Sequence, residues 1–109
     1  MKKYIINATG TTSLKVPYPF NSWVEYWSDN SNFNLPTVCP ACGQSCIEGQ
    51  LDGCHVYIIH SELIFCNKLF LDHNISRNDF PMYIVPLCKS CNHKPDIFSV
   101  DEELLIPAP

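Results

Sequence analysis

Basic residues are scarce in this chain. Seven Lys and Arg stand against eleven Asp and Glu, which gives a formal net charge of −4. No cluster of Lys or Arg follows Lys2 and Lys3, so the chain lacks the basic field with which nucleic-acid-binding proteins attract phosphates. A DNA or RNA partner would therefore depend on a local patch, although nucleases with acidic metal sites tolerate such a charge balance.

Long apolar runs are also absent. No segment approaches the roughly 18 consecutive apolar residues of a membrane span, so we expect no membrane partner. Residues 1–8 contain two lysines but only a short apolar stretch, well below the ~7–15-residue apolar region of a signal peptide. The sequence therefore predicts a cytoplasmic location, where thiols stay reduced and paired cysteines usually bind metal.

Glycine is rarer than proline, with four Gly against nine Pro in 109 residues. This balance predicts many short elements and few long helices. The chain is 46% hydrophobic, too apolar for a disordered segment, and its length suits one domain with a modest core. We expect a single α+β domain over residues 1–109.

Local patterns predict the individual elements. Ser22 and Glu25 have the spacing of a capping box, which predicts a short helix over about 23–29. Trp23, Tyr26 and Trp27 would share one face of it and pack in the core, with a base-stacking surface as the alternative. Strands are expected at residues 3–6, 55–59, 82–85 and 97–100, and a further strand or helix at 62–71. Loops are expected at residues 49–53 and 72–79.

Two Cys-x-x-Cys pairs are the most specific motif in the sequence. Cys39 and Cys42 form the first pair, and Cys88 and Cys91 form the second. Two such pairs can close a tetrahedral zinc site of four thiolates. The alternatives are disulfides or buried free thiols, and Cys46 is a competitor for the place of Cys42. A zinc site would leave Cys46, Cys54 and Cys66 as ordinary buried thiols.

Three stretches together resemble a known family. Cys39–Cys42, the segment 52–56 (Asp-Gly-Cys-His-Val) and the segment 86–92 (Pro-Leu-Cys-Lys-Ser-Cys-Asn) resemble the zinc-stapled branch of the HNH (His-Me finger) endonucleases. The resemblance covers about residues 37–95 and extends to small bacterial or phage HNH-like proteins. It implies a treble-clef or ββα core in which the zinc is structural.

The resemblance also implies a catalytic site. His55 would be the general base that activates water against a phosphodiester bond, since an imidazole can accept a proton at neutral pH. Asp52 and His93 would be the ligands of a catalytic Mg²⁺ or Mn²⁺ ion. His60 and His73 fit no such pattern and are expected at the surface or in turns.

The chain departs from the family pattern at three places. Cys54 occupies the position before the general base, where the family usually has Asp or His, and a thiol does not suit a hard divalent ion. Tyr83 stands where the family commonly has the Asn that orients the base. His93 follows Cys91 too closely, and Pro95 ends any helix there. The alternative hypothesis is therefore a non-catalytic zinc module that binds a protein partner.

Overall fold

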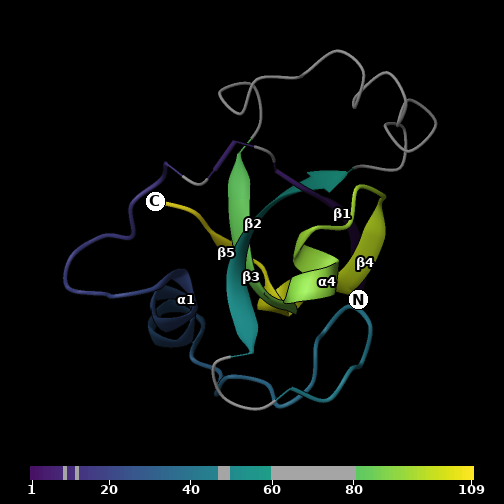
Figure 1. The fold of residues 1–109 in the computed structure, drawn as a ribbon, viewed down its shortest axis with the longest axis horizontal. Coiled ribbons are helices and arrows are strands. Elements are labelled where there is room, and N and C mark those ends of the chain that lie inside the picture. Colours follow the sequence, from purple (N-terminus) through teal and green to yellow (C-terminus); the bar gives the residue numbers. More distant parts are fainter. Residues whose placement is uncertain (9, 12, 47–49, 60–80) are drawn as a thin grey trace.

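The computed structural model describes residues 1–8, 10–11, 13–46, 50–59 and 81–109. Within this part the chain forms one antiparallel sheet with helices beside it, a small α+β fold as predicted (Figure 1). The elements are β1 (Lys2–Asn7), α1 (Trp23–Ser31), β2 (Leu51–Ile59), β3 (Met82–Cys88), α4 (Lys89–Asn92), β4 (Phe98–Asp101), the 3-10 helix η1 (Glu102–Leu104) and β5 (Ile106–Pro107). The sheet has five strands in the order β4-β1-β2-β3-β5.

Four of the predicted strands are present as β1, β2, β3 and β4. Their β-branched and aromatic residues suit a sheet that is buried on both faces. Each neighbouring pair is antiparallel, and the register places His55 of β2 opposite Ile84 of β3. The predictions for residues 62–71 and 72–79 fall outside the described residues, as do His60 and His73.

One predicted loop is wrong. A loop is predicted over residues 49–53, of which residue 49 lies outside the described residues, but β2 already begins at Leu51, and Gly53 pairs with Pro86 of β3. Gly53 does not form a turn; its lack of a side chain lets α1 pack closely against β2. A Cβ atom at this position would come within 2.5 Å of the carbonyl carbon and Cβ of Trp23 and within 2.6 Å of the backbone nitrogen of Val24.

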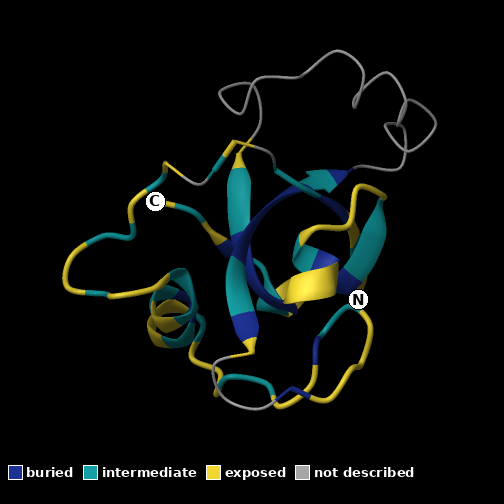
Figure 2. Ribbon diagram, in the orientation of Figure 1, coloured by how far each residue is buried: buried dark blue, intermediate teal, exposed yellow. Residues whose placement is uncertain are grey.

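Alternating side chains divide β2 between two different surroundings. His55 and Tyr57 face one way, and the His55 ring meets the Trp23 ring of α1 edge to face at a centroid distance of 4.5 Å. Cys54 and Val56 face the other way, into the cluster that contains Cys39, Cys88 and Cys91. Figure 1 shows α1 and α4 on opposite sides of the β2–β3 pair, and Figure 2 shows buried residues along the strands between them.

Helix α1 begins at Trp23 as predicted and ends at Ser31, two residues beyond the predicted end. The Ser22 side chain accepts a hydrogen bond from the Glu25 backbone N–H at 3.1 Å, which satisfies one free donor of the first turn. The chain leaves the helix at Asn32, whose φ of 64° is a left-handed conformation that asparagine tolerates. Trp27 is fully buried, so the predicted core role of this face is confirmed.

Within the described residues, neither α-helix has the length or the apolar composition that crossing a bilayer would need.

Replacing Gly53 with alanine is expected to destabilise the protein by about 1–3 kcal/mol, the usual range for an overpacked core. The obstructing atoms include backbone of α1, so relief requires moving the helix. Urea unfolding at equilibrium measures the effect. Adding Trp23→Ala to this variant should not restore its stability, because alanine keeps the obstructing Cβ and backbone atoms at position 23. An unchanged unfolding midpoint for Gly53→Ala would contradict this account of the packing.

Candidate metal centre

The first cysteine pair lies in a tight loop before β2. Val38 and Ser45 form an isolated bridge at its base. Two backbone hydrogen bonds of 2.8 Å close the loop, from the Gly43 N–H to the Cys39 carbonyl and from the Cys39 N–H to the Gln44 carbonyl. Gly43 has a φ of +75°, a conformation that glycine adopts without steric cost. Gly43 therefore allows the chain to fold back around the sulfur atoms of Cys39 and Cys42.

The second cysteine pair lies where β3 becomes α4. Cys88 is the last residue of the strand and the N-cap of the helix, and Cys91 lies within the helix and is buried. His93 caps the C-terminal end, and its N–H donates to the Lys89 carbonyl at 3.2 Å. The predicted helical turn is thus present and ends before Pro95.

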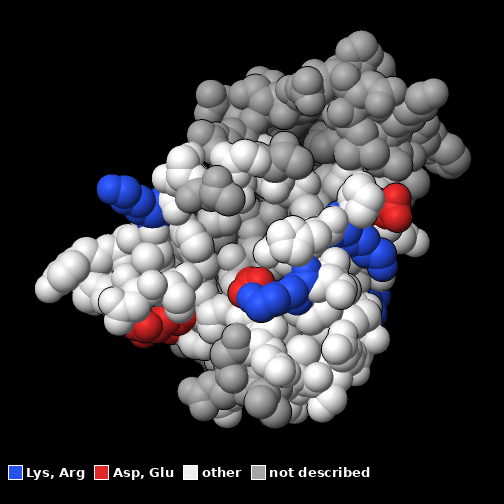
Figure 3. Space-filling model, viewed as in Figure 1, with Lys and Arg blue, Asp and Glu red and all other residues white. Residues whose placement is uncertain are grey.

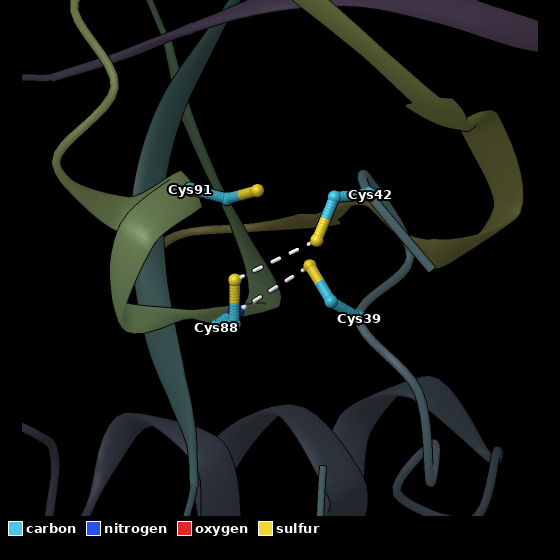
Figure 4. A group of neighbouring side chains, drawn as sticks. All are labelled: Cys39, Cys42, Cys88 and Cys91. Atoms are coloured by element: carbon cyan, nitrogen blue, oxygen red, sulfur yellow. Dashed lines mark hydrogen bonds between the residues drawn. The ribbon is translucent and has the colours of Figure 1, made fainter. Parts of the chain in front are cut away.

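The structure brings the two pairs together. The four sulfur atoms, of Cys39, Cys42, Cys88 and Cys91, all lie within 4.8 Å of one another. They point toward a common centre from the loop before β2 and from the junction of β3 with α4 (Figure 4). Among the described residues this is the one group of three or more His, Cys, Asp or Glu side chains with such spacing.

The geometry of the four thiols fits a zinc ion. Sulfur atoms that surround one zinc at about 2.3 Å stand about 3.8 Å apart, and the Sγ atoms of Cys42 and Cys88 are 3.8 Å apart. The Cys88 backbone N–H also points at the Cys39 sulfur, at 3.4 Å, the kind of contact that stabilises a thiolate. The donor set is therefore suited to a soft or borderline metal such as zinc.

The protein environment distinguishes the four thiols. Burial by itself raises the pKa of Cys39, but backbone N–H groups of Cys88, Cys42 and Ala41 outweigh it and lower the pKa to about 7. Burial raises the pKa of Cys88 and of Cys91. The backbone N–H groups around Cys39 thus favour its thiolate form, whereas burial favours the neutral thiols of Cys88 and Cys91. Binding a metal must displace protons from Cys88 and Cys91, so metal affinity rises with pH through the neutral range.

The other described cysteines are not part of the group. The Cys46 thiol donates to the Gln44 carbonyl at 3.5 Å, and the Cys54 thiol to the Asp52 carbonyl at 3.3 Å. Burial, followed by the nearby Asp52 carboxylate, raises the pKa of Cys54, so this side chain stays a neutral thiol. Both are buried as predicted, while Cys66 lies outside the described residues.

The residues proposed for catalysis have different surroundings. Asp52 forms an ion pair with Lys89, with Nζ 3.3 Å from Oδ1. His55 is 6% exposed and faces Trp23, on the side of β2 opposite to α4. His93 is exposed just beyond α4. The strand–strand–helix order of β2, β3 and α4 is the order that the HNH resemblance implies. Among the described residues, Asp52 and His93 do not belong to any group of three or more potential metal ligands.

A contact of the centre that sequence analysis did not find comes from β1. The Asn7 side-chain amide donates to the Cys91 carbonyl at 2.8 Å and to the Lys94 carbonyl at 2.9 Å. Cys91 lies 84 positions after Asn7 in the sequence, and Lys94 lies 87 positions after it. A single asparagine at the end of a strand gives no local signal for such a contact.

Comparison of the chain with protein-family models, curated proteins and solved structures finds no match. The HNH resemblance therefore remains a hypothesis based on the motifs themselves.

Proposed function

We propose that this protein is a zinc-binding interaction module in which the four cysteines hold a structural zinc ion and His55 performs no nuclease chemistry. The observation that carries the proposal is the convergence of four thiols within 4.8 Å. A zinc ion with four protein ligands has no open position for water or substrate, as is usual for structural sites. In this role the zinc joins the loop before β2 to the end of β3.

The surroundings of His55 support the absence of catalysis. A general base must come within about 3 Å of the proton that it abstracts, whereas His55 is 6% exposed and its ring contacts Trp23. The carboxylate of Asp52, the proposed ligand of a second metal ion, pairs with Lys89 on the other side of the sheet. A phosphodiester would therefore have to displace α1 before it reached the imidazole.

The charge distribution gives no support to a nucleic-acid partner. The described basic residues are Lys2, Lys3, Lys15, Lys89 and Lys94. Three of them pair with carboxylates at 3.3–3.6 Å: Lys2 with Asp101, Lys3 with Glu102 and Lys89 with Asp52. On the face drawn in Figure 3, the blue areas are small and separate, and several lie beside red ones. Among the described residues, this face has no continuous basic stripe of the kind that binds a phosphate backbone.

A recess at the start of α1 supports a protein partner. This α1–β2 recess has a volume of about 630 Å³. It is lined by Ser22, Trp23, Val24, Glu25, Leu35, Leu51, Asp52 and Gly53. Apolar walls with a few polar groups at the rim are typical of surfaces that receive a side chain of a partner. The Glu25 carboxylate at this recess favours a basic side chain, in agreement with the net charge of −4.

The test combines metal content with plasmid cleavage. We expect purified protein to contain one zinc per chain by elemental analysis, and neither it nor His55→Ala to cut plasmid DNA in Mg²⁺ or Mn²⁺. Cleavage by the zinc-loaded parent that disappears in His55→Ala would overturn the proposal in favour of the HNH endonuclease hypothesis. A folded parent without metal would remove the structural zinc on which the proposal rests.

A further inference from the structure

We propose that Asn7 is a positioning residue of the metal centre, whose side-chain amide fixes the turn that carries Cys91 and thereby slows the release of zinc. The proposal rests on the proposed function, because it concerns the metal that the four cysteines bind. Asn7 is the last residue of β1, which lies outside the segment 37–95 that resembles the HNH family. In this proposal β1 therefore contributes to the stability of the metal centre.

The amide of Asn7 donates one hydrogen bond to the last turn of α4 and one to a residue just beyond the helix. Its Nδ2 atom carries two protons, and it lies 2.8 Å from the Cys91 carbonyl oxygen and 2.9 Å from that of Lys94. The last carbonyl groups of a helix have no partner within the helix. The side chain from β1 supplies partners there, so it stabilises the turn immediately after the last cysteine.

Only one orientation of this amide is compatible with its surroundings. Turning it over would place the Asn7 oxygen against the carbonyl oxygens of Cys91 and Lys94, and all three are acceptors. In the observed orientation the Asn7 Oδ1 atom is buried and accepts no hydrogen bond within the part of the chain that the structure describes. The hydrogen bonds of this side chain with described residues are therefore donated by its amide nitrogen.

Helix α4 needs such outside support. It has four residues, and a single helical turn is not stable by itself. Its N-terminal end is fixed by Cys88 in the sheet. At its C-terminal end the Cys91 carbonyl accepts the Lys94 N–H at 3.2 Å and the Asn7 amide at 2.8 Å, and of these two only Asn7 comes from another element. Without the contact from Asn7, Cys91 can swing away from the other three sulfurs. Loss of a group that orients a metal ligand typically lowers metal affinity about 10–100-fold.

The experiment measures zinc release from the full chain. Zinc-loaded Asn7→Ala is mixed with an excess of a chromogenic chelator, and the transfer rate is compared with that of the parent. We expect release to be at least about tenfold faster, from the range given for groups that orient a ligand. In the same samples, alkylation followed by mass spectrometry should show Cys91 labelled sooner relative to Cys39 than in the parent.

Two control variants separate positioning from general stability. Asn30→Ala removes another asparagine amide that bonds a helix carbonyl, that of Tyr26 at 2.8 Å, but in α1. Ile84→Val lowers stability by about 0.5–1.5 kcal/mol from a buried site in the Trp27 cluster. Both should release zinc at the parent rate and keep the parent order of cysteine labelling.

The outcomes distinguish this proposal from the proposed function. A parent that binds no zinc overturns both. A zinc-loaded parent whose release rate and labelling order are unchanged in Asn7→Ala overturns the role of Asn7 alone, as does equal acceleration in Ile84→Val. If Asn7→Ala does not fold, Asn7→Ser, which also lacks the amide, is measured against the same criteria.

Discussion

Replacing Cys88 with serine is expected to abolish stoichiometric zinc binding and cooperative unfolding. Cys88 joins β3 to α4, and its sulfur lies 3.8 Å from that of Cys42. Structural zinc sites have apparent binding free energies of about 10–16 kcal/mol, whereas a small domain is stable by about 5–15 kcal/mol in total. Loss of the metal therefore removes a stabilisation about as large as the whole free energy of unfolding. Elemental analysis and thermal unfolding followed by circular dichroism measure the two effects.

Cys46→Ala is the matched control for this substitution. Cys46 is also buried and lies near the centre, but its thiol bonds the Gln44 carbonyl and is not part of the four-cysteine group. This variant should retain one zinc per chain and unfold cooperatively at a somewhat lower temperature. A Cys88→Ser protein that keeps its zinc and its melting temperature would refute the role of the centre, and loss of zinc in Cys46→Ala would indicate a different ligand set.

Replacing Trp27 with alanine is expected to lower the free energy of unfolding by about 3–5 kcal/mol, the range for truncating a large aromatic side chain in a core. Trp27 is fully buried with Ile84 and Ile106, and its indole N–H donates to the Leu104 carbonyl at 2.7 Å. Truncation creates a cavity between α1 and the sheet and leaves that carbonyl without its donor. Urea unfolding at equilibrium measures the change.

The Trp27→Phe variant keeps an aromatic ring at this site but lacks the indole N–H. Its free energy of unfolding should fall by clearly less than that of Trp27→Ala, by about 1–3 kcal/mol. Both Trp27 variants should retain zinc while folded, because α1 and α4, the helix that carries Cys91, lie on opposite sides of β2 and β3 (Figure 1). A loss below about 1 kcal/mol for Trp27→Ala would contradict the tight packing of this cluster.

Sequence analysis succeeded where the signal is local. The spacing of Cys39 to Cys42 and of Cys88 to Cys91 is fixed within a single turn, so the two halves of the centre could be recognised without knowing the fold. Ser22 at the start of α1 is similarly local, because its side chain bonds the N–H of Glu25 three residues later. Apolar runs identified four of the strands for the same reason.

Sequence analysis failed where the answer depends on pairing between distant residues. Gly53 resembles a loop residue until the approach of α1 is known. Whether His55 and Asp52 share a site depends on their alternation along β2 and on which helix covers each face, and neither follows from a motif. Asn7 contacts residues more than 80 positions away, and its role is visible only once β1 lies beside the cysteine pairs.

The position of β1 inside the sheet has a consequence for biosynthesis. β1 lies between β2 and β4, and Lys2 is directly opposite Asp101. During translation the first strand therefore leaves the ribosome long before β4, one of its two neighbours, has been made. Contacts of such sequence separation form slowly because distant segments must meet. The exposed edge of β1 is thus open to pairing with other nascent chains until residues 98–101 emerge.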